Sequence, residues 1–207
     1  MNNSIKSFVL ILTLGLLQAC QSPSEKPQIN QPLWQLQIDQ SELNFTSTKN
    51  ESISESHAIK FSKGEVNSLL LAELILDLNQ VETQIPIRNQ RIKDILFETD
   101  KFPQASIKAQ LNKTLPFNTP FDIAFELNLH GIVKELSAQV MIQINEEGPK
   151  SEMVVTTYTP VLIHAKDFGL DAGINQLTQI AKLKAISYEV PVDFKLVFHK
   201  KLIQNKL

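Results

Sequence analysis

Apolar and polar residues alternate along most of the chain from Trp34 onward. In the first stretch, Trp34, Leu36 and Ile38 are separated by single polar residues. The same period of two recurs in five more stretches, which are 43–45, 105–111, 121–129, 136–144 and 186–198. Because successive side chains of a strand point to opposite faces, this period predicts strands with one buried face. Many such strands, with no internal repeat, predict an all-β fold in a single domain, as an antiparallel sandwich or barrel.

Two stretches have the three- and four-residue spacing of a helix instead. Ile92, Ile95 and Leu96 recur at this spacing within residues 91–98. In residues 172–185, one helical stripe contains the apolar residues Ile174, Leu177, Ile180, Ala181 and Leu183. Two helices are too few for a bundle, so we expect them to be short lids or plugs on the β-structure.

The composition excludes some classes of protein. Hydrophobic residues make up 43% of the 207 residues and charged residues 20%, which is typical of a globular chain with a buried core. The net charge is −2 and the pI is about 6.1. A protein that neutralises many phosphates would carry more positive charge, so we expect no nucleic-acid partner.

The N-terminus has the pattern of a bacterial secretory signal that ends in a lipidated cysteine. Lys6 precedes an apolar run over residues 8–17, which is too short to span a membrane comfortably. Cys20 is the only cysteine in the sequence, and it directly follows the letters LQA. This arrangement resembles a lipobox, and a lone cysteine excludes a disulfide framework. The alternative is an ordinary secretory signal that is cleaved nearby and leaves an odd thiol.

A lipobox would divide the chain into a signal peptide (1–19), an acylated Cys20 with a flexible tether (20–33), a β-barrel domain (34–200) and a C-terminal tail (201–207). The tether is polar and contains three prolines. Acyl chains of the palmitate kind on Cys20 would anchor the mature protein in a membrane. Gln21 follows the cysteine, which resembles the Gram-negative sorting signal for the outer membrane. We therefore expect a periplasm-facing protein on that membrane.

The sequence contains no group of residues with the spacing of a catalytic or metal site. The four histidines are far apart in the sequence: His57, His130, His164 and His199. No Gly-x-Ser-x-Gly motif is present to activate a serine. The segment DFGLD, residues 167–171, resembles a magnesium-binding kinase motif without its companion motifs, and we interpret it as a strand-to-helix turn. We therefore predict no enzyme, no metal and no cofactor.

Cations are concentrated in the stretch TQIPIRNQRIKDILFE. Arg88, Arg91 and Lys93 fall within six residues of one another, among apolar side chains. Guanidinium groups bind phosphate oxygens through paired hydrogen bonds, so the two arginines are candidates for an anionic head group. The alternative is structural, with Arg88 capping loop carbonyls or pairing with Asp94 or Glu98.

Five segments, in order, resemble the YceI-like family, and together they run from about residue 34 to residue 198. They are WQLQIDQSELNFTSTKN, VETQIPIRNQRIKDILFETDKFPQASI, FELNLHGIVKELSAQV, VLIHAKDFGLDAGI and VPVDFKLVFHK. The resemblance implies an extended lipocalin-like antiparallel β-barrel around a long hydrophobic pocket. The implied ligand is an isoprenoid lipid, either a quinone or a polyprenyl phosphate. The implied function is that of an envelope lipoprotein which sequesters or carries this lipid.

The resemblance also suggests which side chains would contact the lipid. Its head group would lie at the barrel mouth beside Arg88 and Arg91. Its apolar tail would lie along Phe45, Ile107, Phe125, Leu127, Val140, Tyr188 and Phe194. The family pattern has aspartate and histidine where this chain has Asn89 and Arg91, which raises the local positive charge. His130 stands at the end of a predicted strand, where we expect a structural role.

Other functions stay open at this point. A barrel with an apolar interior can be filled by its own side chains, and it would then be a non-enzymatic envelope-stress or protein-interaction scaffold. A redox accessory of a membrane cytochrome is a third hypothesis, although the sequence has no haem-binding motif. We expect a monomer or a homodimer.

Overall fold

The computed structural model describes residues 32–146 and 151–201, so the predicted signal peptide, Cys20 and most of the tether lie outside the described residues. The strands are β1 (Pro32–Leu36), β2 (Glu42–Lys49), β3 (Ile53–Asn67), β4 (Leu71–Glu82), β5 (Gln104–Gln110), β6 (Phe121–Leu129), β7 (Ile132–Asn145), β8 (Glu152–Thr157), β9 (Val161–His164) and β10 (Glu189–Lys200). The helical segments are η1 (Ile38–Gln40), α1 (Pro86–Arg91), η2 (Ile92–Leu96), η3 (Ala165–Phe168) and α2 (Asp171–Ile180).

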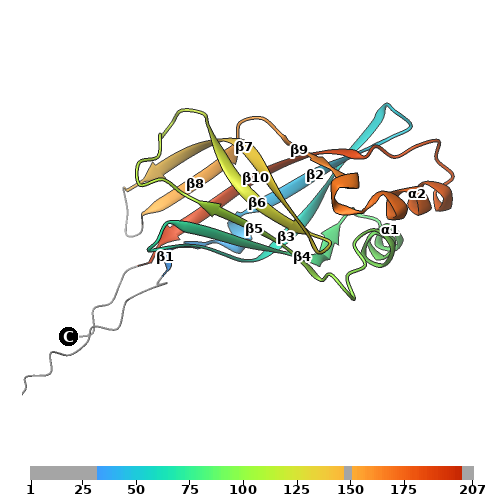
Figure 1. Cartoon of the computed structure of the whole chain (residues 1–207), viewed down its shortest axis with the longest axis horizontal. Coiled ribbons are helices and arrows are strands. Elements are labelled where there is room, and N and C mark those ends of the chain that lie inside the picture. The colour runs from blue at the N-terminus through green and yellow to red at the C-terminus, as the bar shows by residue number, and fades with distance from the viewer. Residues whose placement is uncertain (1–31, 147–150, 202–207) are drawn as a thin grey trace, which may run out of the picture.

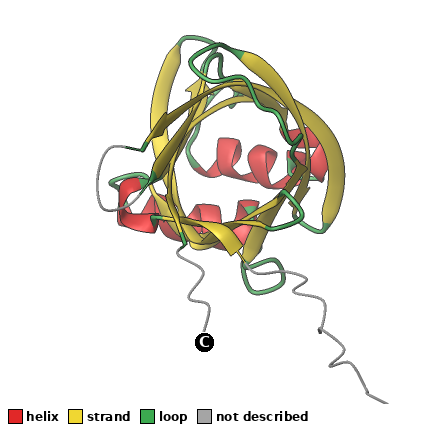
Figure 2. Cartoon of the chain, turned by 90° about the vertical axis from the view of Figure 1, so that its left-hand side faces the viewer, coloured by secondary structure: helices red, strands yellow, loops and turns green. Residues whose placement is uncertain are grey.

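The strands belong to one ten-stranded antiparallel sheet that closes in a ring. Strands β2 to β8 pair in sequence order, and β10 pairs with β2 on one side and with β8 on the other. Outside this path, β1 pairs with β10 and β3, and β9 pairs with β10. Figure 2 looks through the ring. The predicted antiparallel β-barrel fold in a single domain is confirmed.

The period of two in the sequence becomes the inner and outer faces of the ring. On β6, Leu127 belongs to the hydrophobic core and Phe125 packs against it, whereas Asp122 and Glu126 on the other face are exposed. The largest fully buried side chains are Phe168, Leu78, Ile142 and Val140. Burying a side chain of this size contributes roughly 1.5–3 kcal/mol. The interior face therefore supplies most of the hydrophobic stabilisation of the ring.

Glycine is required where β1 packs on β3. A Cβ atom at Gly64 would lie 2.6 Å from the Cβ of Leu36 on β1 and 2.8 Å from a Cδ of Leu74 on β4. Real Cβ atoms essentially never come this close to another carbon. The missing side chain thus allows β1 to pair closely with β3 at the end of the ring where the described chain begins and ends.

The other end of the ring is covered by the helical segments. Figure 1 shows α1 and α2 at the end opposite to β1, and Figure 2 shows helices across the far opening of the ring. The predicted helix at residues 91–98 begins earlier, at Pro86, because proline is favoured in the first turn of a helix. It continues as the π-helical η2 to Leu96. The two short helices lie over one end of the ring, which is the position expected of lids.

The second predicted helix is shorter than the sequence pattern suggested. It ends at Ile180 rather than near residue 185, and Lys182 adopts a left-handed φ of 53°. A non-glycine residue in this conformation ends a helix, so Leu183 does not continue the stripe of Ile174 and Leu177. The expectation of one stripe through Leu183 was therefore wrong.

The two lids touch at Gly173 of α2. A Cβ atom there would lie 2.6 Å from the carbonyl oxygen of Ile95 and 2.9 Å from the Cα of Leu96. Alanine ordinarily stabilises a helix by about 0.5–1 kcal/mol relative to glycine. Here the backbone of η2 occupies the space that the methyl group needs. The glycine therefore serves to bring two backbones together.

We expect Gly173→Ala to lower the free energy of unfolding by about 1–3 kcal/mol, because overpacking must push α2 away from η2. Chemical denaturation followed by circular dichroism measures this loss. Gln176→Ala, at an exposed position of the same helix, is the control and should change stability by less than about 0.5 kcal/mol. A gain in stability for Gly173→Ala, as in an ordinary exposed helix, would contradict the packing described here.

The segment DFGLD forms the turn that the sequence predicts. It follows β9, passes through η3 and ends with Gly169 in a left-handed conformation (φ 67°) before α2 begins. Phe168 is buried at 1% exposure, so the motif has a packing role. Among the described helices, none has the length and hydropathy needed to cross a membrane.

Candidate functional site

Three cavities lie along the inside of the ring, and because neighbouring cavities share wall residues we describe them as the inner, middle and mouth sections of one elongated cavity. The inner section has a volume of about 100 Å³ and the middle section about 140 Å³. The mouth section, beneath α1 and α2, has a volume of about 310 Å³. The inner and middle sections share the wall residues Leu43, Ile107, Phe125 and Phe194. The middle and mouth sections share the wall residues Phe45, Leu96, Ile174 and Val190.

The inner and middle sections are lined by apolar side chains only. These volumes are the space open to the centre of a water-sized sphere, and about 10–15 Å³ of such space holds one water molecule. Both sections are several times larger, but they present no polar partner to a water. Apolar cavities of this kind stay dry and take up apolar ligands. The interior of the ring is therefore suited to an elongated hydrocarbon group.

Six of the seven residues predicted for a lipid tail line this cavity. They are Phe45, Ile107, Phe125, Leu127, Val140 and Phe194. Tyr188 is not among the residues lining the three sections. Its hydroxyl donates to Oδ1 of Asn175 at 2.6 Å, and the ammonium of Lys166 lies 4.3 Å from the centre of its ring. Tyr188 packs against the hydrophobic core, but it precedes β10, so the alternation predicted for the closing strand does not extend to it.

The mouth section differs from the rest of the cavity because polar side chains enter its wall. Lys49 and His57 reach it from β2 and β3, and Arg88 and Arg91 reach it from α1. The remaining wall is mostly apolar, with contributions from α1, η2, α2 and the loop after α2. The cavity thus has a dry interior and a cationic mouth.

Arg88 is held by two groups on neighbouring elements. Its Nη1 donates to Oε2 of Glu55 at 2.5 Å, and its Nη2 donates to the carbonyl oxygen of Thr83 at 2.7 Å. The structural alternative for Arg88 is therefore correct in part, since this side chain does cap a loop carbonyl. Its ion-pair partner is Glu55 rather than Asp94 or Glu98.

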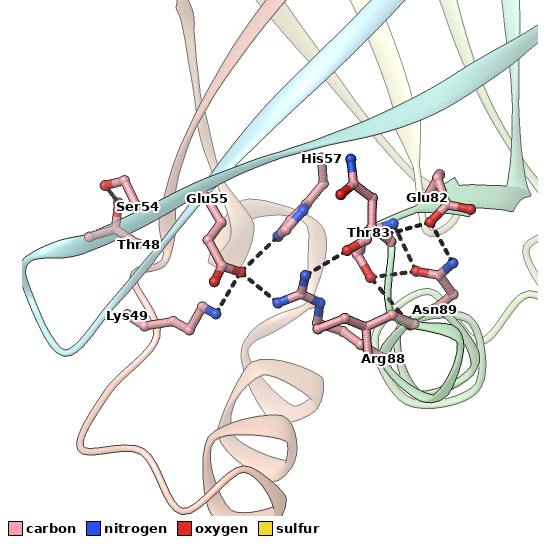
Figure 3. Close-up of polar contacts among 11 residues, drawn as sticks. Thr48, Lys49, Ser54, Glu55, His57, Glu82, Thr83, Arg88 and Asn89 are labelled. Atoms are coloured by element: carbon pink, nitrogen blue, oxygen red, sulfur yellow. Dashed lines mark hydrogen bonds and ion pairs between the residues drawn. The ribbon is translucent and has the colours of Figure 1, made fainter.

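Glu55 is the carboxylate at which the mouth residues meet. Figure 3 shows it between Lys49, His57 and Arg88, and the Nζ of Lys49 lies 2.6 Å from Oε2 of Glu55. The hydrogen bond from Lys49, together with the one from Arg88, lowers the pKa of Glu55 below its ordinary value of 4.5. The carboxylate is partly exposed, so this ion-pair network positions side chains more than it stabilises the fold.

Asn89 fixes the loop that precedes α1. Its Oδ1 accepts hydrogen bonds from the backbone N–H of Thr83 at 2.8 Å and from the hydroxyl of Thr83 at 2.5 Å. Its Nδ2 donates to Glu82 at 3.0 Å. Thr83 is itself buried at 3% exposure. Asparagine therefore supplies the acceptor that this loop needs, although the family pattern has a carboxylate here.

Two donors of the mouth have no partner among the described residues. The Nε of Arg88 is buried and makes no hydrogen bond. Arg91 is half-buried, lines the mouth section and forms no side-chain hydrogen bond or ion pair with another described residue. Buried unsatisfied donors are uncommon in folded proteins. Arg91 thus has hydrogen-bonding capacity left over at the mouth, whereas the unpaired Nε of Arg88 is buried away from it.

His57 is buried at 6% exposure, and its ring packs edge-on against Phe45 with 5.4 Å between the ring centres. Burial lowers the pKa of His57 below its ordinary value of 6.5, and the nearby Arg88 guanidinium lowers it further. The Nε2 of His57 is 3.8 Å from Oε2 of Glu55, which opposes this effect. The imidazole is therefore held in its neutral form at neutral pH.

This lowered pKa predicts a loss of stability in weak acid. The unfolded chain takes up the proton near pH 6.5, whereas the folded chain takes it up only at lower pH. Stability is therefore present above about pH 6.5 and is lost as the pH falls from there to the lower folded pKa. The loss amounts to about 1.4 kcal/mol for each unit of lowering.

Thermal unfolding between pH 7.5 and pH 5.5 measures this effect. We expect the melting temperature of His57→Gln to depend less steeply on pH than that of the natural chain. The control is His164→Gln, since His164 is 51% exposed and should leave the slope unchanged. Equal slopes for His57→Gln and the natural chain would contradict the assignment.

His130 has the structural role that the sequence suggested. It lies in the turn between β6 and β7 with φ 54°. Its Nδ1 is 3.2 Å from the carbonyl oxygen of Phe168, and its Nε2 is 3.1 Å from Oε2 of Glu98. The ring also packs on Phe102, with 4.4 Å between the ring centres. Within the described parts of the chain, no group of histidine, cysteine and acidic residues could hold a metal ion.

Sequence reasoning did not find Lys49, Glu55 and His57 as residues of the site. They lie on the hairpin formed by β2 and β3, more than thirty residues before Arg88. The alternation of this hairpin shows which face is inward, but it does not show that its tip lies beside α1. The one available signal was a basic and an acidic residue flanking the turn, which is common on exposed hairpins.

Comparisons with known proteins agree with the ring and its cavity. The YceI-like domain family matches residues 34–198. The chain is similar to a solved structure described as a polyisoprenoid binding domain from Saccharophagus degradans implicated in plant cell wall breakdown. The sequence identity is 31%, the match covers 83% of this chain and 100% of that one, and the TM-score is 0.76. No curated protein gives a significant match.

Two more distant structures share the fold alone. BcnA from Burkholderia cenocepacia is 16% identical over 78% of this chain and 98% of its own, with a TM-score of 0.59. A YceI protein from Campylobacter jejuni is 12% identical over 75% of this chain and 85% of its own, with a TM-score of 0.53. With a closed antiparallel ring, an apolar cavity and the family match over residues 34–198, the chain belongs to the YceI-like family.

Proposed function

We propose that the chain binds an isoprenoid-type lipid in its cavity and sequesters or carries it. The observation that carries this proposal is the elongated cavity, dry and apolar inside and cationic at its mouth. The similar domain from Saccharophagus degradans, described as polyisoprenoid binding, supports the same ligand class. The YceI-like family consists of binding proteins, so we propose no catalytic reaction.

The tail would occupy the inner and middle sections. Transferring hydrocarbon out of water contributes about 0.8 kcal/mol per CH₂ group. A branched isoprenoid chain has many such groups, and the wall of aliphatic and phenyl side chains needs no hydrogen bond from it. The affinity would therefore come mainly from the tail, and would increase with chain length until the cavity is full.

The head group would occupy the mouth section. Arg91 has no side-chain partner among the described residues, and the Nε of Arg88 is an unsatisfied donor. Hydrogen bonds between a guanidinium and a phosphate oxygen are shorter and stronger than neutral ones. A phosphate head group would thus bind the guanidinium of Arg91 more strongly than a quinone carbonyl would, whereas the Nε of Arg88 is too deeply buried to reach a ligand.

We further propose that the chain is an envelope lipoprotein. Cys20 would be acylated and would anchor a periplasm-facing domain to the outer membrane of a Gram-negative cell. The proposal rests on the signal-like N-terminus and on the periplasmic location of YceI-like proteins. Incorporation of labelled palmitate into the natural chain but not into Cys20→Ser is the expected result. Labelling that persists in Cys20→Ser would contradict acylation at this residue.

The scaffold hypothesis predicts a filled interior. The three cavity sections support the lipid carrier over a ring that is filled by its own side chains. No feature of the described residues favours the scaffold over the lipid carrier. The number of copies in the assembly, one or two, stays a prediction.

Native mass spectrometry tests the binding function directly. We expect protein purified from membranes without detergent to carry a bound species with the mass of an isoprenoid lipid. Extraction with organic solvent should remove this species, and added isoprenoid should restore it. Protein that carries no lipid and takes up no added isoprenoid would refute the proposal.

A further inference from the structure

The surface around the mouth has a composition that the binding function alone does not explain. We define the mouth rim as residues 49–55, 85–91 and 181–187, which are the tip of the β2–β3 hairpin, α1 with the residue before it, and the loop after α2. Backbone hydrogen bonds join two of these pieces, since the N–H of Asn50 donates to the carbonyl of Ala185 at 2.9 Å. The N–H of Lys184 also donates to Oδ1 of Asn50 at 2.8 Å.

The mouth rim exposes large apolar side chains. Ile85 is 45% exposed, Ile87 is 58% exposed, and both also line the mouth section of the cavity. Ile53 at the tip of the hairpin is 52% exposed. Leu183 lines the opposite side of the same opening. The apolar surface of the cavity therefore continues outward onto the surface of the protein.

The mouth rim is also positively charged, whereas the whole chain is not. It contains five cations and two carboxylates, although the net charge of the chain is −2. The cations are Lys49, Arg88, Arg91, Lys182 and Lys184, and the carboxylates are Glu51 and Glu55. Lys182 and Lys184 are exposed and form no ion pair with another described residue. Unpaired cations around exposed isoleucines match the chemistry of an anionic lipid surface.

The position of the mouth rim leaves it free for such a contact. The described chain begins at Pro32 of β1 and ends just after β10, and both lie at the end opposite to α1 and α2 (Figure 1). The described chain therefore begins and ends at the end of the ring far from the mouth rim. No segment of the described chain covers the exposed isoleucines.

We infer that the mouth rim docks on an anionic bilayer. Ile85 and Ile87 enter the boundary between head groups and acyl chains, and Lys182 and Lys184 contact lipid phosphates. The opening of the cavity then faces the bilayer, so an isoprenoid passes between membrane and cavity without exposing its tail to water. This inference rests on the proposed lipid-binding function. It adds the route by which the lipid would move between the membrane and the cavity.

Quenching of tryptophan fluorescence by brominated acyl chains tests the docked orientation. The full chain has one tryptophan, Trp34, at the opposite end of the ring. Trp34→Phe/Ile87→Trp moves the only indole to the mouth rim. Trp34→Phe/Leu69→Trp is the matched control, because Leu69 is 57% exposed in the β3–β4 turn, beside the start of β1. The probe is a vesicle of brominated phosphatidylcholine with phosphatidylglycerol.

We expect the Ile87→Trp variant to be quenched at least about 3-fold more strongly than the Leu69→Trp variant. Equal quenching of the two, or stronger quenching of the control, overturns the inference and assigns the mouth rim to a protein contact instead. If Trp34→Phe impairs folding, the extra emission of Ile87→Trp in the natural chain gives the same comparison. Circular dichroism shows whether the Trp34→Phe variants are folded.

Charge reversal tests the cationic part of the surface. We expect Lys182→Glu/Lys184→Glu to weaken binding to anionic vesicles at least about 10-fold at low salt. Lys60→Glu/Lys113→Glu changes the net charge equally at exposed positions away from the mouth rim, and should weaken binding less than about 2-fold. Equal losses for both pairs contradict the inference.

The failure of this inference differs from the failure of the proposed function. Native mass spectrometry of the same variants reports whether isoprenoid is bound. A protein that holds isoprenoid but shows no preferential quenching at position 87 overturns docking alone. A protein that takes up no isoprenoid overturns the proposed function, whatever the vesicle result.

Discussion

Ala105→Phe is expected to abolish binding of long isoprenoids. Ala105 is buried at 2% exposure and lines the middle section of the cavity, between the mouth and the inner section. A phenyl ring there would occupy much of a section with a volume of about 140 Å³. Because a tail that starts at the mouth must cross this section, we expect the affinity for long isoprenoids to decrease by at least about 100-fold, equivalent to about 2.7 kcal/mol.

A second substitution tests whether the loss of binding depends on the length of the isoprenoid. Ala138 is buried at 4% exposure and lines the inner section only. Ala138→Phe should therefore leave binding of short isoprenoids nearly unchanged and weaken binding of long ones. Native mass spectrometry or fluorescence competition with isoprenoids of different length gives the two profiles. If the two variants have the same length preference, the cavity does not hold the tail in the proposed direction.

The matched control is Ala124→Phe. Ala124 lies on β6 and is exposed on the outer face of the ring. The same change of side chain there should leave binding of every isoprenoid unaltered. Thermal unfolding separates a blocked cavity from an unfolded ring, because overpacking of a core position costs about 1–3 kcal/mol. A variant that has lost the cooperative transition is excluded from the comparison, and the smaller Ala105→Leu replaces it.

Arg91→Gln is expected to weaken binding of a prenyl phosphate by about 10- to 100-fold and to leave binding of the matching prenyl alcohol unchanged. A hydrogen bond to a charged group contributes about 1.5–3 kcal/mol when its partner would otherwise lie unsatisfied. The unpaired guanidinium at the mouth is the group that would make this bond. Isothermal titration with the phosphate and the alcohol isolates the contribution of the head group.

Two further variants control this comparison. Lys93→Gln removes a cation two residues away that does not line the mouth section, and should alter neither affinity. Arg88→Gln removes the partner of Glu55 and of the Thr83 carbonyl, so it should lower stability as well as phosphate affinity. If Arg91→Gln weakens both ligands equally, Arg91 shapes the mouth and does not recognise charge.

The sequence predicted the wall of the cavity well because alternation is a local signal. A strand of period two has a known inner face, and six of the seven proposed tail residues line the cavity as a result. The same signal does not show which strands become neighbours. The pairing of Leu196 with Val155 closes the ring, but neither sequence segment marks the other as its partner.

The mouth was predicted less completely because it is assembled from distant segments. Arg88 and Arg91 could be found, since two arginines in four residues stand out in a chain of low charge density. Glu55 is the ion-pair partner that orients Arg88. The position of Glu55 depends on how β3 runs past the loop before α1, and the sequence does not show this. The end of α2 was predicted at the wrong residue because Lys182 adopts a left-handed backbone conformation. A lysine gives no sign of this conformation in the sequence.

The pairing of β10 has a consequence for when a ligand can be taken up. This strand, the last of the described strands, pairs with β1, β2, β8 and β9, and its pairings with β1 and β2 join residues separated by about 150 positions. Pairing between such distant residues closes a long loop, whose entropic cost must be met before the contacts stabilise the fold. During synthesis, or during passage through a secretion channel in linear order, the earlier strands can only form an open sheet. The ring closes only when the twelve-residue β10 pairs on both sides, so uptake of the proposed lipid would follow that step.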